Sequence, residues 1–159
     1  MTKLSYKEAL ARAQNLCSRQ EKCIADIEKK LHEWGVSVDV EKIINSLIKE
    51  NFVNEKRYAD AFAKEKFRFN HWGKIKIRYA LRQKNINEET ITTGLDEIDK
   101  DEYAETLKKL ILDKYKSTKA KNTYELRGKL QKYVFGKGFE NEMVIKIINE
   151  IISKNNSSN

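Results

Sequence analysis

The sequence predicts an all-helical protein built from three tandem three-helix repeats. Three observations support this fold class. The 159 residues include no proline and only six glycines, the residues that interrupt helices most strongly. Apolar residues recur at helical spacing in nine segments, and these segments align in groups of three. With 40% apolar residues, the chain is too apolar for a disordered one.

The first repeat is expected over residues 1–52. Ser5 and Glu8 have the spacing of a capping box, in which the serine accepts a bond from the N3 amide and the glutamate bonds back to the cap. Ser18 and Glu21 repeat this spacing, which predicts that the second helix begins there. The end of the second helix and the two limits of the third are expected at Gly35, Asp39 and Asn51.

The second repeat is expected over residues 53–99. Asn54 is a suitable cap for the fourth helix, whose apolar stripe would contain Tyr58, Phe62 and Phe69. Residues 70–73 are expected to form a turn. The fifth helix would run over residues 74–84, and its end and the cap of the sixth helix are expected at Asn85 and Asn87.

The third repeat is expected over residues 100–153. Its first helix would run from about residue 101 to 115, followed by a basic loop over residues 116–122. Thr123 would cap the eighth helix and Asn141 the ninth. Residues 154–159 are polar and small, and they are expected to be a disordered tail.

The three repeats align on Val36, Ile86 and Phe139. The positions five before and twelve after each anchor are apolar in all three copies. A unit of about 50 residues buries little surface alone, so stacking into an elongated, curved, right-handed or solenoid-like array is expected. The alternative is that any amphipathic helices can be slid into such a register. The equivalent positions are Leu31, Leu81 and Val134, and Ile48, Ile98 and Ile151.

Positive charge is concentrated in two blocks. Residues 56–84 hold ten basic and two acidic residues, an excess equal to the net charge of +8 of the whole chain. Residues 108–137 have the same excess, and residues 85–105 between them carry eight acids and one lysine. Basic side chains interleaved with aromatic rings are typical of nucleic-acid binding. The alternative is a solvated basic face whose aromatic residues fill an ordinary core.

Candidate DNA- or filament-binding residues lie in both blocks. Within the fifth helix, Lys74, Arg78 and Arg82 are spaced i, i+4, i+8, which predicts one stripe. Tyr124 is interpreted as either a core or a stacking residue, and Tyr133 as a core residue. The full set of candidates is Arg57, Lys66, Arg68, Lys74, Lys76, Arg78, Arg82, Lys84, Lys119, Lys121, Arg127, Lys129, Lys132 and Lys137.

Other classes of protein find little support. Cys17, Cys23 and His32 do not have the spacing of a zinc site. No glycine-rich phosphate loop or hydrolase motif occurs, so neither catalytic residues, a cofactor, a metal nor a small-molecule substrate is predicted. No apolar run approaches the roughly 18 residues of a membrane span, and the N-terminus lacks a signal-peptide core. A cytoplasmic, non-enzymatic protein is expected.

Three tracts resemble the RecX family of recombinase regulators. The first is residues 52–59, FVNEKRYA, similar to that family's apolar-acid-acid-x-Arg-aromatic-Ala tract. The second joins Gly73, Ile77 and Leu81 to Lys84-Asn85-Ile86, and the third is residues 133–139, YVFGKGF. The likeness spans roughly residues 8–152. It departs from the family pattern where Asn54 replaces a usual Asp, Asn85 a usual Gly and Lys137 a usual Arg.

The resemblance implies a modulator that binds the RecA filament on DNA and lies in its groove. Such a protein restrains the filament's ATPase, strand exchange and SOS-type activity, and it also binds single- or double-stranded DNA. The acidic block would face basic filament surface. Two alternatives stay open: a free-standing, helix-turn-helix-like nucleic-acid-binding regulator, and a repeat scaffold that binds acidic proteins. Because Asn54 departs from the family, any contact that needs an acid there is in doubt.

Overall fold

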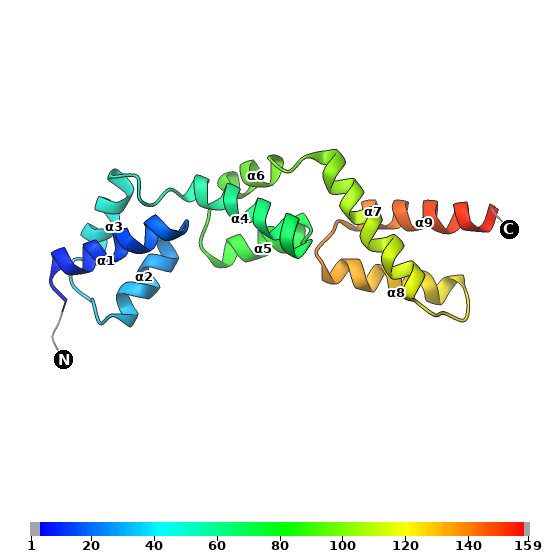
Figure 1. The fold of residues 1–159 in the computed structure, drawn as a ribbon, viewed down its shortest axis with the longest axis horizontal. Coiled ribbons are helices and arrows are strands. Elements are labelled where there is room, and N and C mark those ends of the chain that lie inside the picture. Colours follow the sequence, from blue (N-terminus) through cyan, green and yellow to red (C-terminus); the bar gives the residue numbers. More distant parts are fainter. Residues whose placement is uncertain (1–3, 158–159) are drawn as a thin grey trace. The chain divides into compact units, whose positions relative to one another are not determined.

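The computed structural model describes residues 4–157, and within this range it contains nine helices and no strands (Figure 1). The all-helical fold class is therefore confirmed. The helices are α1 (Tyr6–Arg19), α2 (Ile24–Glu33), α3 (Val40–Lys49), α4 (Glu55–Asn70), α5 (Lys74–Gln83), α6 (Glu88–Asp96), α7 (Lys100–Ser117), α8 (Thr123–Gly136) and α9 (Asn141–Ser157).

The chain divides into two compact units. The first unit comprises Met1–Phe62 and Ala80–Gly94, and the second comprises Ala63–Tyr79 and Leu95–Asn159. The division passes through α4 and α5 rather than between predicted repeats. The repeat limits at residues 52 and 99 remain a prediction.

The core of the first unit is formed by the apolar faces of α1, α2 and α3. Ala13, Leu31 and Leu47, one from each helix, are fully buried. Trp34 packs against the same cluster, and Arg12 lies over its ring at 5.4 Å from the centroid. The small alanines on α1 allow the helices to approach closely, so three short helices bury one shared core.

The start of α2 differs from the sequence prediction. Ser18 lies inside α1, where its hydroxyl donates to the Gln14 carbonyl one turn earlier. The cap of α2 is Cys23, whose amide donates to the Asp26 carboxylate at 3.3 Å. Two capping patterns thus lie five residues apart, and α1 continues through the first because nothing there breaks the helix.

Three of the other predicted caps are confirmed by hydrogen bonds. The side chains of Ser5, Asn54 and Asn87 accept from the amides of residues Glu8, Arg57 and Thr90 at 3.1, 2.9 and 2.8 Å. Asp39 stands at the N-cap of α3 without such a bond. Asn122 caps α8 one position before the predicted cap, Thr123, which is the first residue of the helix.

One turn recurs at the three predicted anchors. The amides of Val36, Ile86 and Phe139 donate to the carbonyls five residues earlier, at 2.8, 3.2 and 3.3 Å. The residue before each anchor has a left-handed backbone, with φ of 75° at Gly35, 61° at Asn85 and 91° at Gly138. This geometry is a Schellman-type helix end. The turn therefore repeats as the sequence alignment predicts.

The second unit has an aromatic core around Tyr103. Its ring lies 5.5 Å from that of Phe67 and 5.1 Å from that of Phe139. Its hydroxyl accepts from the Lys74 amide at 3.0 Å and donates to the Glu140 carboxylate. Burial and the bond to Glu140 raise the pKa of Tyr103. The phenol therefore stays neutral and ties the start of α5 to the α8–α9 turn.

The structure differs from the sequence prediction at one apolar position and at the C-terminal tail. Phe69 is 80% exposed, and Phe67 occupies the buried position on α4 instead, because the stripe follows residues 59, 63 and 67 at i+4 spacing. The tail expected from residue 154 is helical to Ser157. Ile151 and Ile152 are buried just before it, and no glycine or proline follows to end the helix. Residues 158–159 lie outside the described range.

Candidate nucleic-acid interface

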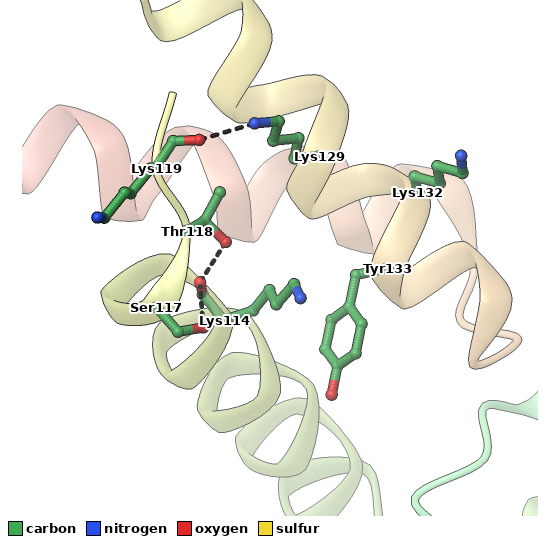
Figure 2. Close-up of a pocket in the computed structure, with 7 residues that line it drawn as sticks. All are labelled: Lys114, Ser117, Thr118, Lys119, Lys129, Lys132 and Tyr133. Carbon is green, nitrogen blue, oxygen red and sulfur yellow. Dashed lines mark hydrogen bonds between the residues drawn. The ribbon is translucent and has the colours of Figure 1, made fainter. Parts of the chain in front are cut away.

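A pocket lined by four lysines lies in the second unit, where α7 leads through a short loop into α8 (Figure 2). Its volume is about 600 Å³. We call it the lysine pocket, and it is lined by Lys114, Ser117, Thr118, Lys119, Lys129, Lys132 and Tyr133. No carboxylate is among the lining residues, so the pocket presents only cationic, hydroxyl and aromatic groups.

The local sequence explains how the lysines come together. Lys114 lies in the last turn of α7, where a cation interacts favourably with the helix dipole. Residues 118–122 then cross to α8. The Asn122 side chain caps this helix by accepting a hydrogen bond from the Glu125 amide at 2.8 Å. Lys129 and Lys132 follow on α8. Two helices joined by a five-residue loop thus place separate lysines around one space.

Among the described residues, Lys129 is the one lysine of the pocket for which an acidic partner is found. Lys129 lies 3.0 Å from the Glu125 carboxylate and donates to the Lys119 carbonyl at 2.7 Å. Hydrogen bonds from Lys129 and from the Lys121 amide lower the pKa of Glu125. Within residues 4–157, Lys119 and Lys132 have no acidic partner. Figure 2 shows their side chains pointing away from the pocket centre on opposite sides.

Tyr133 forms the aromatic wall of the pocket. Lys114 Nζ lies 5.0 Å and Lys137 Nζ 5.9 Å from its ring centroid, within the range of cation–π attraction. The ring is only half-buried. The prediction of a core role for Tyr133 is therefore wrong, because the ring packs against lysine side chains instead of entering the apolar core with Leu130 and Val134.

The chemistry available in the pocket is anion binding. The Ser117 and Thr118 hydroxyls donate to the Lys114 carbonyl at 3.2 and 2.5 Å. Their protons are thereby used within the protein, which leaves the ammonium groups as the donors for a ligand. Charge-assisted bonds of ammonium groups to phosphate oxygens are stronger than neutral hydrogen bonds. Nothing in the pocket resembles a nucleophile paired with a base.

The pocket contains three of the predicted residues and one that sequence reasoning missed. Lys119, Lys129 and Lys132 were predicted, whereas Lys114 was not. A signal for Lys114 existed. It precedes the basic loop by one helical turn, and antiparallel helices joined by a short loop bring such positions opposite the first turns of the next helix. Of the other candidates in the second basic block, residues 108–137, Lys121 is exposed in the loop, Arg127 lies on α8 and Lys137 is the C-cap of that helix.

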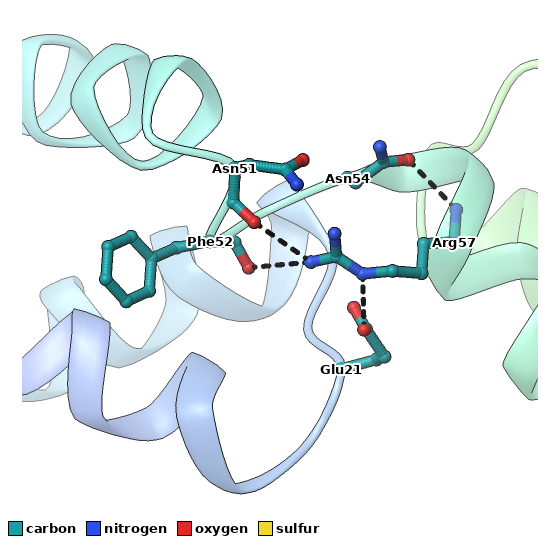
Figure 3. Close-up of polar contacts among 5 residues, drawn as sticks. All are labelled: Glu21, Asn51, Phe52, Asn54 and Arg57. Atoms are coloured by element: carbon teal, nitrogen blue, oxygen red, sulfur yellow. Dashed lines mark hydrogen bonds and ion pairs between the residues drawn. The ribbon is translucent and has the colours of Figure 1, made fainter.

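Arg57 of the first basic block, residues 56–84, is engaged within the first unit (Figure 3). Its Nε lies 2.5 Å from the Glu21 carboxylate, and a terminal nitrogen donates to the carbonyls of Asn51 and Phe52 at 3.1 and 3.3 Å. The guanidinium therefore joins the start of α4 to the end of α1 and the α3–α4 turn. This geometry uses most of its donors in the fold.

Two other candidates on α5 and just after it also have acidic partners in the first unit. Lys84 Nζ lies 2.7 Å from the Asp26 carboxylate, and Arg82 is paired with Glu88. The bond to Glu88 raises the pKa of Arg82. Because α5 runs unbroken from Lys74 to Gln83, Arg82 shares one helix side with Lys74 and Arg78.

The remaining candidates of the first basic block lie in the second unit. Lys66 and Lys76 are 5.2 and 4.7 Å from the centroid of the Trp72 ring, and Lys74 is 5.0 Å from that of Tyr103. Arg68 is 3.6 Å from the Glu102 carboxylate. Arg78 is half-buried. Lys66, Lys74 and Lys76 therefore lie over aromatic rings, whereas Arg68 is paired with an acid.

Two family models match this chain. Residues 54–95 match the second three-helix domain of RecX, and residues 101–148 match the third. The chain belongs to the RecX family. The lysine pocket lies wholly within the third RecX domain, and Arg57 lies in the second.

Relatives and solved structures agree with the RecX assignment. The chain is 31% identical to the "Regulatory protein RecX" of Clostridium acetobutylicum over 96% of its own length and 72% of the relative's. It is also 31% identical to the "Regulatory protein RecX" of Clostridium beijerinckii, over 91% of this chain and 73% of the relative. A crystal structure of regulatory protein RecX matches 94% of this chain and 79% of its own, with 26% identity and a TM-score of 0.78. The crystal structure of RecX from Lactobacillus salivarius has 22% identity and the same TM-score of 0.78, and the match covers 91% of this chain and 94% of that one.

Two further properties bear on the RecX chain. Among residues 4–157, no helix combines the length and apolar character that a membrane span requires. In the same range, no three His, Cys, Asp or Glu side chains gather in a way that suits a metal ion.

Proposed function

We propose that this RecX-family chain modulates the RecA recombinase by binding the RecA–DNA filament in the cytoplasm, and that the lysine pocket contacts the DNA backbone. The observation that carries the DNA contact is the gathering of four lysines without a lining carboxylate in the third RecX domain. The family supplies the link to RecA.

Modulation of this kind needs no catalysis by the chain itself. A protein that binds one state of a filament more tightly than another shifts the filament toward that state by the difference in affinity. If the bound state is slow in ATP hydrolysis and strand exchange, the protein acts as an inhibitor. The lysine pocket would hold the chain on the polyanionic component, and other surfaces would contact RecA.

A charge-reversal experiment tests the DNA contact. Lys119→Glu with Lys132→Glu changes two lysines of the pocket that have no acidic partner in the described residues. The matched control is Lys29→Glu with Lys49→Glu, which reverses two exposed lysines of α2 and α3 and changes the net charge equally. DNA affinity is measured by fluorescence anisotropy from 50 to 200 mM salt.

We expect the pocket variant to lose affinity and to reduce the slope of log affinity against log salt by about 2, since each phosphate neutralised contributes about −0.9. The control should keep the slope. Equal losses in both variants would show that only net charge matters and would contradict a role for the pocket.

The RecA part of the proposal is tested separately, by the ATPase and strand-exchange rates of RecA filaments with and without the chain. A decrease in both rates at micromolar concentration is expected. If DNA binding is present and the rates do not change, the chain is instead a free-standing helical nucleic-acid-binding protein.

A further inference from the structure

Tyr124 is the most exposed large apolar residue among those described, at 88% of its full surface. It lies in the first turn of α8, and Gly128 follows one turn later on the same side of the helix. An aromatic ring left in water gains nothing for folding, since its contribution to stability comes from burial. Both faces of the Tyr124 ring are therefore accessible to a binding partner.

Gly128 also lacks a structural reason. It lies inside a helix with no positive φ, and a Cβ added there would meet nothing within 4 Å. Glycine inside a helix is less favourable than alanine. No neighbouring segment requires the missing side chain. What glycine provides here is an open surface beside the Tyr124 ring.

The ring and the glycine border a shallow groove of about 400 Å³. Its lining combines one aromatic ring, one amide and three cationic side chains, together with Glu125, whose carboxylate is already paired with Lys129. The lining residues are Tyr124, Glu125, Arg127, Gly128, Lys129, Gln131 and Lys132. Rings for stacking beside cations for phosphates are the elements of single-strand binding surfaces.

The groove adjoins the lysine pocket, because Lys129 and Lys132 line both. A chain of nucleotides with one base on Tyr124 would therefore have its next phosphates beside the pocket lysines. Cations alone attract single and double strands alike. An exposed ring distinguishes the two, because base faces are accessible in a single strand and covered by neighbouring bases in a duplex.

We propose that this surface, the Tyr124 platform (Tyr124, Arg127, Gly128, Gln131 and Lys132), binds single-stranded nucleic acid by stacking a base on the Tyr124 ring across the open surface at Gly128. This inference rests on the proposed DNA contact of the lysine pocket. It adds to that contact a preference for single strands and names the residue that produces it.

The test compares a single-stranded oligonucleotide with a duplex of the same length, by anisotropy at fixed salt. Tyr124→Ala should weaken single-strand binding at least fivefold, as expected for loss of one base–aromatic stack. Duplex affinity should change less than about twofold, and the salt slope should stay unchanged because no phosphate contact is removed. Tyr124→Phe, which keeps the ring, should bind like the wild type.

Gly128→Gln gives an independent test, because it covers the open surface and leaves Tyr124 in place. It should also weaken single-strand binding, while thermal unfolding shows a helix at least as stable as before. A folded Gly128→Gln protein with unchanged single-strand affinity would overturn the platform, as would equal losses for both strand types in Tyr124→Ala.

The outcomes separate this inference from the proposed function. If Lys119→Glu with Lys132→Glu weakens DNA binding but Tyr124→Ala does not, the pocket contact stands and the platform is wrong. If Tyr124→Ala changes the effect on RecA without changing DNA affinity, the ring is a protein contact and the platform is again wrong. If the wild type binds no DNA, both proposals fail.

Discussion

Lys84 and Asp26 form an ion pair that is lost at low pH, where Asp26 is protonated, and at high pH, where Lys84 is deprotonated. Burial acts to raise the pKa of Asp26, but bonds from Lys84 and Cys23 outweigh it and hold the pKa below its usual value. The bond to Asp26 raises the pKa of Lys84. The pair therefore stabilises the first unit above the unfolded carboxyl pKa of about 3.9 and below the unfolded amine pKa of about 10.4. That stabilisation is lost as the pH falls through the lowered pKa or rises through the raised one.

We predict that Lys84→Gln lowers the free energy of unfolding at pH 7 by about 1 kcal/mol, a modest value because the Lys84 side chain is 41% exposed. The difference from the wild type should shrink as the pH falls toward about 2.5, because the pair's stabilisation is lost as the pH falls through the lowered pKa of Asp26. Urea unfolding at pH 7, 4 and 2.5 measures it, with Lys49→Gln on α3 as the control. A difference that persists undiminished at pH 2.5 would contradict the pairing.

The wild type's own pH dependence cannot isolate the Lys84–Asp26 pair, because Glu55 changes stability with pH in the opposite direction. Burial raises its pKa, so its ionised form opposes folding at neutral pH and this cost disappears as the pH falls. The Cys23 thiol nearby is also affected, since burial raises its pKa to about 11. It stays protonated at neutral pH and serves as a small apolar group at the helix cap.

The charge of a lysine could be predicted from the sequence, but its partner could not. Lys84 was a candidate for DNA binding because it lies in a basic block, whereas Asp26 lies 58 residues earlier. Helix periodicity assigns a residue to a side of its own helix and gives no distance to another. The same limit applies to Arg57 and Glu21, which are 36 residues apart.

At the scale of elements, Gly73 and Gly138 mark a close backbone approach in the second unit. The Gly73 amide donates to the Lys137 carbonyl at 2.7 Å, and the Ile75 amide donates to the Gly138 carbonyl at 3.0 Å. A Cβ at Gly73 would overlap the Gly138 backbone, and one at Gly138 would overlap Lys76. The α8–α9 turn therefore lies directly on the start of α5, and glycine is required on both sides.

We predict opposite effects for two glycine substitutions. Gly73→Ala should lower the free energy of unfolding by about 1–3 kcal/mol, because the backbones must separate to admit the methyl group. Gly128→Ala, in the open surface of α8, should raise it by up to about 1 kcal/mol through helix propensity. Thermal and urea unfolding measure both. Equal effects of the two substitutions would show that the close approach at Gly73 does not exist.

Element positions were mostly predictable, since capping residues and periodicity act within a few neighbours. Asn54, Asn87 and the left-handed turn at Asn85 behave as their side chains indicate. The errors arise where two local signals compete. Ser18 and Cys23 both stand at the start of a capping pattern for α2, and α1 continues through Ser18 because nothing there breaks the helix. Lys114 was missed because its role depends on how α7 and α8 pair.

At the scale of the whole chain, the notable property is the alternation of charge along the sequence. Part of the acidic block has structural partners, since Glu88 pairs with Arg82, Glu102 with Arg68, and Asp99 caps α7. Other acids of the second unit border a groove of about 750 Å³ between α7 and α9. We call it the acidic groove, and it is lined by Asp101, Ala104, Glu105, Lys108, Glu142, Met143, Lys146, Ile147 and Glu150.

In the proposed function the cationic surfaces contact DNA, whereas the carboxylates of the acidic groove are suited to a basic surface of RecA. Mutations in the acidic groove should therefore change RecA modulation without weakening DNA binding. We predict that Glu105→Lys with Glu142→Lys raises the concentration for half-maximal RecA inhibition about tenfold, a loss of about 1.4 kcal/mol. DNA affinity should stay equal or increase, because positive charge is added.

The matched control is Glu28→Lys with Glu41→Lys on exposed positions of α2 and α3. A control that weakens inhibition equally, or a groove variant that inhibits like the wild type, would show that the acidic groove does not contact RecA and that modulation depends on DNA contacts alone.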